Sequence, residues 1–191
     1  MTNINIVKEL IKYAQRAELE GLCKHKSGNF SIIDRATGLV YITPSGFYRA
    51  DLTVDDIVIS DIKGHVRENV NFRKPSIELS MHLKVYEARP SVNAIVHTHS
   101  PYATAFAVKG IPIEPVTSEA YFYGKNMELV PYYEHGTEEL AEHVAKSIKY
   151  VDVCLLKNHG VLAVGDTMEN ALLKATYVES VAMIDYISRT L

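Results

Sequence analysis

Residues 93–101 form an apolar run that ends in two histidines, His97 and His99, separated by one residue. Because side chains alternate between the two faces of a β-strand, both imidazoles would face the same side, roughly 6–7 Å apart along the strand. Two imidazoles at that spacing can tilt onto one metal ion with Zn–N bonds of about 2.0–2.1 Å. Pro101 ends the strand pairing and can occupy the first position of a helix. The segment therefore predicts a metal site at the carboxyl end of a buried strand.

The size and charge of the chain restrict the classes of protein to which it can belong. Its 191 residues are enough for one well-cored domain, and we expect residues 1–191 to form a single domain. Hydrophobic residues make up 47% and charged residues 23%, which is ordinary for a globular protein. The formal net charge of -3 argues against a nucleic-acid partner, which would require a strongly basic surface.

Cysteine usage and the N-terminus bear on the cellular compartment. Cys23 and Cys154 lie far apart and form no C-x-x-C pair, which is typical of thiols in a reducing cytoplasm. The first residues lack the basic and apolar regions of a signal peptide, and no apolar run approaches the roughly 20 residues that span a bilayer. We therefore expect a cytoplasmic protein without a membrane partner.

The order of predicted elements indicates the fold class. Periodicity and turn signals predict helices over residues 4–20, 77–88, 101–109, 137–149 and 167–189. They predict strands or extended segments over residues 30–33, 39–42, 56–61, 65–68, 92–98, 111–116, 128–131, 151–156 and 161–164. Several strands follow one another through tight turns before helices begin to separate them. This order favours an α/β fold with much antiparallel pairing and differs from the alternation of a doubly wound fold.

Two further residues are candidates for the metal site. His159 lies in an Asn-His-Gly turn between two apolar segments, and three histidines with one open position are typical of a catalytic zinc. The alternative is a solvent-exposed turn histidine. Glu78 lies in the first turn of a predicted helix and can either ligate the metal or act as a base, although a plain capping carboxylate is the alternative. His82, on the same helical face, is expected to support or pack behind the site.

Three short polar turns can present backbone N–H groups to an anion such as phosphate. They are Gly28-Asn29, Ser45-Gly46 and the turn at Ser76, and the alternative for each is an ordinary turn. Tyr121-Phe122-Tyr123-Gly124 is an aromatic cluster that lines either a pocket or a subunit contact, unless it only packs.

Taken together, these motifs resemble the class II aldolase family, which includes sugar-phosphate aldolases, epimerases and the adducin head domain. The resemblance covers nearly the whole chain and rests on Ser27–Ser31, Ile42–Gly46, Lys74–Glu78, Arg89-Pro90, Asn93–Ala103, Gly136–Leu140 and Asn158–Gly160. It implies a three-layer α/β/α sandwich around a mostly antiparallel sheet. It also implies a homotetramer with active sites between neighbouring subunits.

The resemblance further implies roles for individual residues. The metal, expected to be one Zn2+ per subunit, would be held by His97, His99, His159 and Glu78, and Glu78 would also move protons. Gly28, Asn29, Ser45, Gly46 and Ser76 would hold the phosphate of a sugar-phosphate substrate.

The chain departs from the family pattern at the predicted phosphate site. Ile77 stands where aldolases of the family often carry a second serine, and a lost hydrogen bond to a charged group is worth about 1.5–3 kcal/mol. Lys26 can compensate for this loss by its charge. Ala120 stands where epimerases carry a catalytic aspartate, and the sequence ends at Leu191 without the tail that supplies an aromatic lid residue in some members.

The resemblance thus implies reversible aldol cleavage of a small ketose phosphate through a metal-stabilised enediolate. Tyr123, from a neighbouring subunit, is the predicted proton donor to the departing aldehyde. An epimerase, a dehydratase or a decarboxylase of a related sugar or acid phosphate can use the same metal site, and a non-catalytic, adducin-like scaffold is the alternative outside enzymes.

Overall fold

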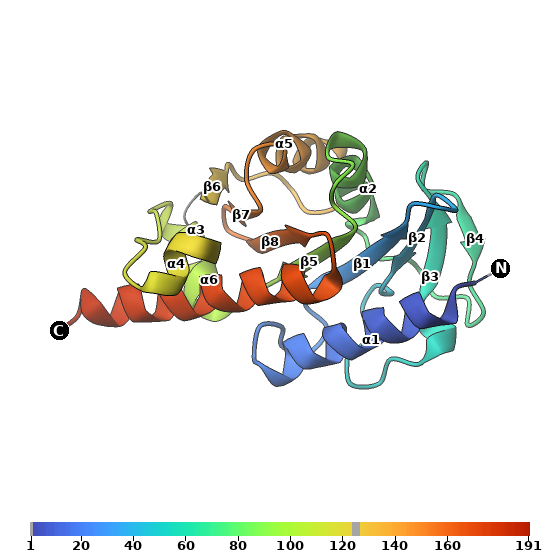
Figure 1. Ribbon diagram of the computed structural model, residues 1–191, viewed down its shortest axis with the longest axis horizontal. Coiled ribbons are helices and arrows are strands. Elements are labelled where there is room, and N and C mark those ends of the chain that lie inside the picture. The colour runs from blue at the N-terminus through green and yellow to red at the C-terminus, as the bar shows by residue number, and fades with distance from the viewer. Residues whose placement is uncertain (1, 124–126) are drawn as a thin grey trace.

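The computed structural model of the protein describes residues 2–123 and 127–191, which form an eight-stranded sheet between two layers of helices (Figure 1). The helices are α1 (Ile4–Leu19), α2 (Leu79–Ala88), α3 (Pro101–Lys109), α4 (Ser118–Tyr123), α5 (Glu138–Ile148) and α6 (Met168–Ser188), with a 3-10 helix, η1, at Val54–Asp56. The strands are β1 (Asn29–Asp34), β2 (Leu39–Ile42), β3 (Val58–Asp61), β4 (Val66–Glu68), β5 (Ala94–Thr98), β6 (Met127–Val130), β7 (Val153–Leu156) and β8 (Gly160–Gly165).

The strand order is β4-β3-β2-β1-β5-β8-β7-β6. Within the described residues, β6 and β7 are the one parallel pair, and every other neighbouring pair is antiparallel. This arrangement places β5, the strand of the two histidines, between β1 and β8 in the middle of the sheet. A central strand is buried on both faces, which explains its unbroken apolar sequence.

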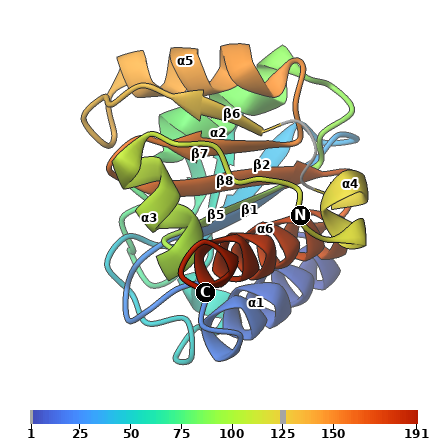
Figure 2. The same ribbon diagram turned by 90° about the vertical axis from the view of Figure 1, so that its left-hand side faces the viewer.

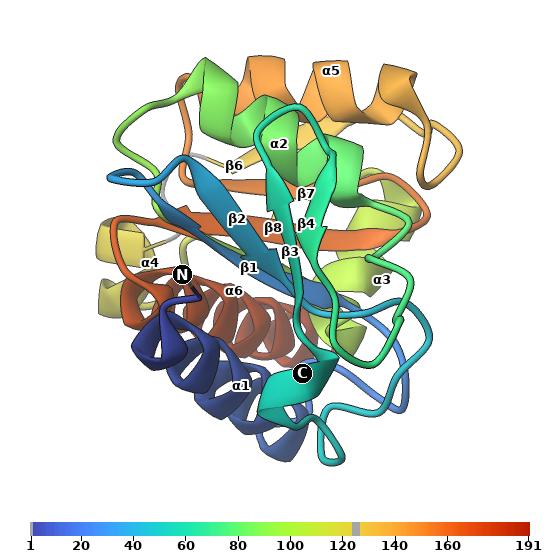
Figure 3. The ribbon, with the colours of Figure 1, turned by 90° about the vertical axis from the view of Figure 1, so that its right-hand side faces the viewer.

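Helices cover both faces of the sheet. Helices α2 and α5 lie on one face, and α1 and α6 lie on the other (Figures 2 and 3). Side chains of β5 alternate between the two cores, because Ala94 and Val96 pack on the α1 and α6 side while Ile95 packs on the α2 and α5 side. The predicted three-layer α/β/α fold with a mostly antiparallel sheet is confirmed.

Local boundaries differ from the sequence prediction at several places. Helix α2 begins at Leu79 rather than at residue 77, because residues 76–79 first form a tight turn in which the Leu79 N–H donates to the Ser76 carbonyl at 3.0 Å. Within the predicted strand 56–61, residue 56 closes η1 instead, and β3 starts only at Val58. Residues 111–116 form an irregular connection.

The first three residues of the aromatic cluster, 121–123, belong to helix α4, which the sequence analysis did not predict. Tyr121 is exposed, while Gly124 and the side chain of Tyr123 lie outside the described residues. The predicted role of Tyr123 therefore stays a prediction. Across the described segments, none of the helices combines the length and apolar character needed to span a lipid bilayer.

Candidate metal centre and substrate pocket

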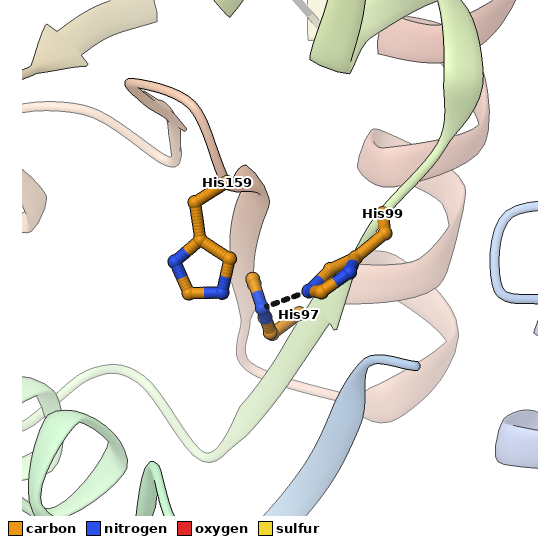
Figure 4. A group of neighbouring side chains, drawn as sticks. All are labelled: His97, His99 and His159. Atoms are coloured by element: carbon orange, nitrogen blue, oxygen red, sulfur yellow. Dashed lines mark hydrogen bonds between the residues drawn. The ribbon is translucent and has the colours of Figure 1, made fainter. Parts of the chain in front are cut away.

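The end of β5 aims two imidazoles at each other. His97 is fully buried, and its Nδ1–H donates to the carbonyl of Val161 on the neighbouring strand β8 at 2.9 Å. In a neutral ring that bond leaves Nε2 of His97 as an unprotonated lone pair. Nε2 of His99 lies 3.0 Å from it (Figure 4). Two nitrogens at this separation can both bind one ion at about 2.0–2.1 Å.

His159 is brought to the pair by the turn between β7 and β8. Asn158 adopts a left-handed backbone conformation (φ 57°), which lets the chain reverse within residues 157–159. The His159 ring then lies 4.8 Å from His97 and 5.1 Å from His99, measured between ring centroids. One nitrogen from each of the three rings lies within 4.8 Å of the others. The two histidines at the end of β5 and the sequence-distant His159 thus form one cluster that can hold a metal ion.

Gly160 makes this close approach possible. A Cβ at Gly160 would overlap the carbonyl oxygen of Thr98 and lie 3.1 Å from Cδ2 of His99 and 3.3 Å from Cε1 of His97. The first residue of β8 therefore has no room for a side chain.

Glu78 supplies an oxygen to the same cluster. Its carboxylate lies 3.2 Å from Nε2 of His97 and 3.4 Å from Nε2 of His159. Burial raises the pKa of Glu78, but the nearby imidazoles of His97 and His159 and the hydrogen bond from the Asn29 amide outweigh burial and hold that pKa well below its usual range. The Glu78 side chain is therefore an anion beside the three imidazoles.

The donor set fits a divalent cation. Oε1 of Glu78 is buried without a hydrogen-bond partner among the described residues, so it has a free lone pair on the side of the histidines. Burial, reinforced by the neighbouring His97, lowers the pKa of His99 to about 3 and that of His159 to about 4. Both imidazoles are then neutral near pH 7, which is the form that binds metal. Nitrogen and carboxylate ligands suit several divalent ions.

A one-way chain of hydrogen bonds lies behind Glu78. Asn29 Nδ2 donates to Glu78 Oε2 at 2.8 Å, which leaves Asn29 Oδ1 as the acceptor for His82 Nε2–H at 2.6 Å. His82 Nδ1 must then accept from the Ser31 hydroxyl at 2.6 Å, and Ser31 accepts from the Tyr86 hydroxyl at 2.7 Å. Every donor in the chain points towards the carboxylate.

This series of hydrogen bonds requires His82 to be neutral, because its Nε2 donates while its Nδ1 accepts. Complete burial lowers the pKa of His82 to about 3. Its place behind Asn29 agrees with the sequence prediction of a supporting role. Ser31 and Tyr86 were not predicted as part of this arrangement, although Tyr86 lies one helical turn after His82 and so shares its face.

The predicted phosphate-binding turns converge on one cavity of about 290 Å³ beside the metal cluster. All five predicted residues line it, namely Gly28, Asn29, Ser45, Gly46 and Ser76, together with His99 and His159. The Asn29 side chain is already engaged by Glu78 and His82, so in this structure its amide serves the carboxylate. Lys26 and Ile77 also line the cavity, as their positions in the sequence predict.

Two lining residues were missed by the sequence analysis. Arg49 is only 1% exposed, and nothing in its surface-like sequence context signals that it is buried under the cavity. His135 precedes Gly136 at the cavity wall, and its ring centroid lies 6.4 Å from that of His159. The Gly-Thr-Glu-Glu motif that begins directly after His135 is one of those that carry the family resemblance. It is the one sequence signal that could have pointed to His135.

Comparison with known proteins decides the family. Residues 8–186 match the family described as Class II Aldolase and Adducin N-terminal domain. The chain belongs to the class II aldolase family. Its relatives include the L-fuculose phosphate aldolase of Methanococcus maripaludis, which is 42% identical over 164 residues, covering 86% of this chain and 87% of that protein. The 5-deoxy-D-ribulose 1-phosphate aldolase of Bacillus thuringiensis is 37% identical over 184 residues, covering 96% and 85% of the two chains.

A solved structure of an L-fuculose 1-phosphate aldolase superposes on this class II aldolase with a TM-score of 0.92 at 35% identity. That match covers 100% of this chain and 89% of the solved one. The prediction of a class II aldolase is therefore confirmed. The family is metal-dependent, and the three histidines of this chain can bind a metal.

Proposed function

We propose that this class II aldolase reversibly cleaves a small ketose 1-phosphate into an aldehyde and a phosphorylated three-carbon ketone. One observation supports this proposal most strongly: the cluster of three histidines and Glu78 borders the same cavity that the polar turns line. The names of the relatives support the substrate class, since they act on L-fuculose phosphate and 5-deoxy-D-ribulose 1-phosphate.

The proposed metal is Zn2+, one per subunit, held by His97, His99, His159 and Glu78. Three neutral imidazoles with one carboxylate form a typical catalytic zinc set when the carboxylate can be exchanged for substrate. When bound, the ion would supply Lewis-acid stabilisation of the negative charge that develops on the substrate oxygens.

Glu78 is the proposed proton carrier. In the cleavage direction, the hydroxyl that becomes the aldehyde oxygen gives up its proton, which ends on the Glu78 carboxylate. The carbon–carbon bond breaks, the aldehyde leaves, and Glu78 passes the proton to the remaining enediolate carbon. In the synthetic direction, the Glu78 carboxylate removes that proton again. The bond from Asn29 fixes one carboxylate oxygen and leaves Oε1 free for the proton. Tyr123 of a neighbouring subunit remains the proposed residue at the aldehyde oxygen. Its hydroxyl would donate a proton to that oxygen in the synthetic direction and relay the proton away from it in cleavage.

The turns at Gly28-Asn29, Ser45-Gly46 and Ser76 are the proposed phosphate cradle. We also propose a cytoplasmic homotetramer of single-domain subunits. The support for subunit contact is a row of exposed apolar side chains on the second half of α6, formed by Met183, Ile184, Tyr186 and Ile187. Contiguous exposed apolar side chains of this kind mark interaction surfaces.

Among the alternatives, the epimerase has the weakest support from the chain. Ala120, which stands in place of the epimerase aspartate, is buried at 1% exposure in α4 and has no titratable group. The dehydratase and the decarboxylase would use the same cluster and are separated from the aldolase by their products.

A product screen tests the proposal directly. Purified protein supplied with Zn2+ is incubated with a panel of ketose 1-phosphates and 5-phosphates, and the products are identified. We expect an aldehyde and dihydroxyacetone phosphate from at least one ketose 1-phosphate. Absence of cleavage across the panel, with carbon dioxide released from keto-acid phosphates, would replace the aldolase with the decarboxylase.

A further inference from the structure

Arg49 is a buried cation under the floor of the substrate cavity. It is 1% exposed and lines the cavity together with Ser45 and Gly46. Two other buried ionised groups, Asp56 and Asp185, form ion pairs with arginine side chains. Among the described residues no carboxylate forms an ion pair with Arg49. Burying a charge without a counter-ion is unfavourable, so this position requires an explanation.

The hydrogen-bond partners of the Arg49 guanidinium are backbone carbonyl groups. Its guanidinium donates to the carbonyls of Lys26 at 3.3 Å, Ser27 at 3.1 Å and Gly28, and it also donates to the Phe47 carbonyl. Its Nε–H is buried and has no acceptor among the described residues. Carbonyl dipoles orient the group and hold the loop of residues 26–28. Glu18 acts on the guanidinium only from beyond ion-pair distance, so the positive charge has no paired counter-ion among the described residues.

The charge of Arg49 borders the cavity directly, because its side chain is part of the cavity lining. Burial lowers the pKa of Arg49, although a guanidinium stays protonated in proteins. The carbonyl groups around it fix its position. Arg49 is therefore a permanent positive charge at a fixed place beside the cavity.

The other candidate cation is less suited to recognise an anion in the cavity. Lys26 is exposed, and its Nζ lies 5.0 Å from the ring centroid of Tyr48. Solvent screens an exposed ammonium strongly, whereas a buried charge acts through a lower dielectric. Ile77 lines the same cavity and has no side-chain donor. The proposed phosphate cradle thus has one serine hydroxyl fewer than the family pattern, because Ile77 replaces the second serine. It has in addition one buried cation, Arg49, that the sequence analysis did not predict.

We propose that Arg49 is a specificity-determining residue whose buried charge favours the doubly ionised phosphate of the substrate. This inference rests on the proposed function, since it assigns the phosphate to the cavity that Arg49 underlies. The arriving dianion offsets the unpaired charge, and the loop of residues 26–28, held by the same guanidinium, keeps its shape around the phosphate.

The test compares Arg49→Gln with Arg16→Gln, which removes one exposed arginine charge on α1 away from the cavity. Competitive inhibition of cleavage by inorganic phosphate and the KM for the best ketose 1-phosphate are measured on metal-loaded protein. For Arg49→Gln we expect KM and the phosphate inhibition constant to rise by about 10- to 100-fold, the range of a lost charged hydrogen bond. We expect metal content to stay equal and kcat to change much less than KM.

A second readout separates charge from structure. For the wild-type chain and Arg16→Gln, inhibition by phosphate strengthens between about pH 6 and about pH 8 as the dianion forms. For Arg49→Gln we expect a flatter dependence, which a merely structural loss would not produce. If Arg49→Gln does not fold, Arg49→Lys replaces it, because an ammonium lacks the planar fork of arginine and should still weaken phosphate binding.

The outcomes are distinct. A wild-type chain that neither cleaves ketose phosphates nor is stabilised by inorganic phosphate would overturn the proposed function. A wild-type chain that does both, with variants at position 49 that bind phosphate as tightly as Arg16→Gln does, would overturn the role of Arg49 alone.

Discussion

Asn29 donates a hydrogen bond of 2.8 Å to Glu78 Oε2, joining the first residue of β1 to the residue just before α2. The same amide accepts from His82, which prevents Asn29 from rotating. One carboxylate oxygen is therefore held, while Oε1 lies 3.4 Å from Nε2 of His159 without another partner among the described residues. A carboxylate that is fixed at one oxygen and free at the other is suited to repeated proton transfer.

Replacing Glu78 by glutamine should separate chemistry from metal binding. Three imidazoles remain, so Glu78→Gln should keep most of its metal, whereas turnover should fall by about 10²–10⁴-fold because an amide carries no exchangeable carboxyl proton. Metal analysis and kcat for cleavage are measured side by side. Glu138→Gln, which changes an exposed carboxylate paired with Lys84, is the control. Unchanged turnover in Glu78→Gln would remove this residue from the reaction.

Replacing His159 by alanine should remove the metal. Its imidazole is one of three that converge on the site, and the remaining two would bind a divalent ion much more weakly. We expect His159→Ala to lose bound metal on dialysis and to lose activity with it, as should His97→Ala. His143→Ala, which removes a half-buried ring stacked on Tyr133 in α5 away from the cluster, should retain both. A metal content equal to that of the wild type would show that His159 is not a ligand.

A single methyl group at Gly160 should damage the site without touching a ligand. The added Cβ would overlap the Thr98 carbonyl oxygen and crowd the rings of His97 and His99. Overpacking of this kind costs about 1–3 kcal/mol, so Gly160→Ala should melt at a lower temperature and bind metal less tightly. The control for metal affinity is Gly21→Ala, whose Cβ meets nothing within 4 Å. The left-handed backbone of Gly21 (φ 78°) lowers the stability of that variant by a separate route, so the two variants are compared in metal affinity alone. Equal metal affinity in the two variants would contradict the close packing of β8 against β5.

Acid should destabilise the metal-free protein partly through His82. Burial lowers the pKa of His82 from 6.5 to about 3, so the unfolded chain binds the extra proton between these values. The contribution of His82 is therefore fully present above about pH 6.5 and declines as the pH falls, by about 1.4 kcal/mol per pH unit. Urea unfolding in the presence of a chelator, compared between wild type and His82→Gln, should show a shallower pH dependence in the variant. Parallel curves would mean that His82 protonates equally in both states.

The histidine pair and the central strand followed from the sequence because their signals are local. Strand alternation places His97 and His99 on one face, and the Asn-His-Gly turn restricts the position of His159 to the end of β8. The start of α2 could not be predicted in the same way. The Ser76 turn is held by tertiary contacts, including the bridge between Pro44 and Pro75.

Arg49 and Ser31 could not be found from the sequence because their importance is set by long-range contacts. Arg49 follows two aromatic residues in what reads as a surface turn, and only the folded loop of residues 26–28 encloses it. Ser31 is an ordinary strand residue until β1 lies beneath α2 and brings its hydroxyl to His82. Buried polar networks join distant segments, and no local pattern records them.

The most direct measurement is the rate of aldehyde release from a ketose 1-phosphate by one protein sample before chelation, after complete metal removal and after Zn2+ is restored. Three histidines and Glu78 beside the cavity predict that release stops with the metal and returns with it, while the folded state persists throughout. Undiminished aldehyde release from protein shown to be metal-free would contradict a metal-dependent cleavage at this site.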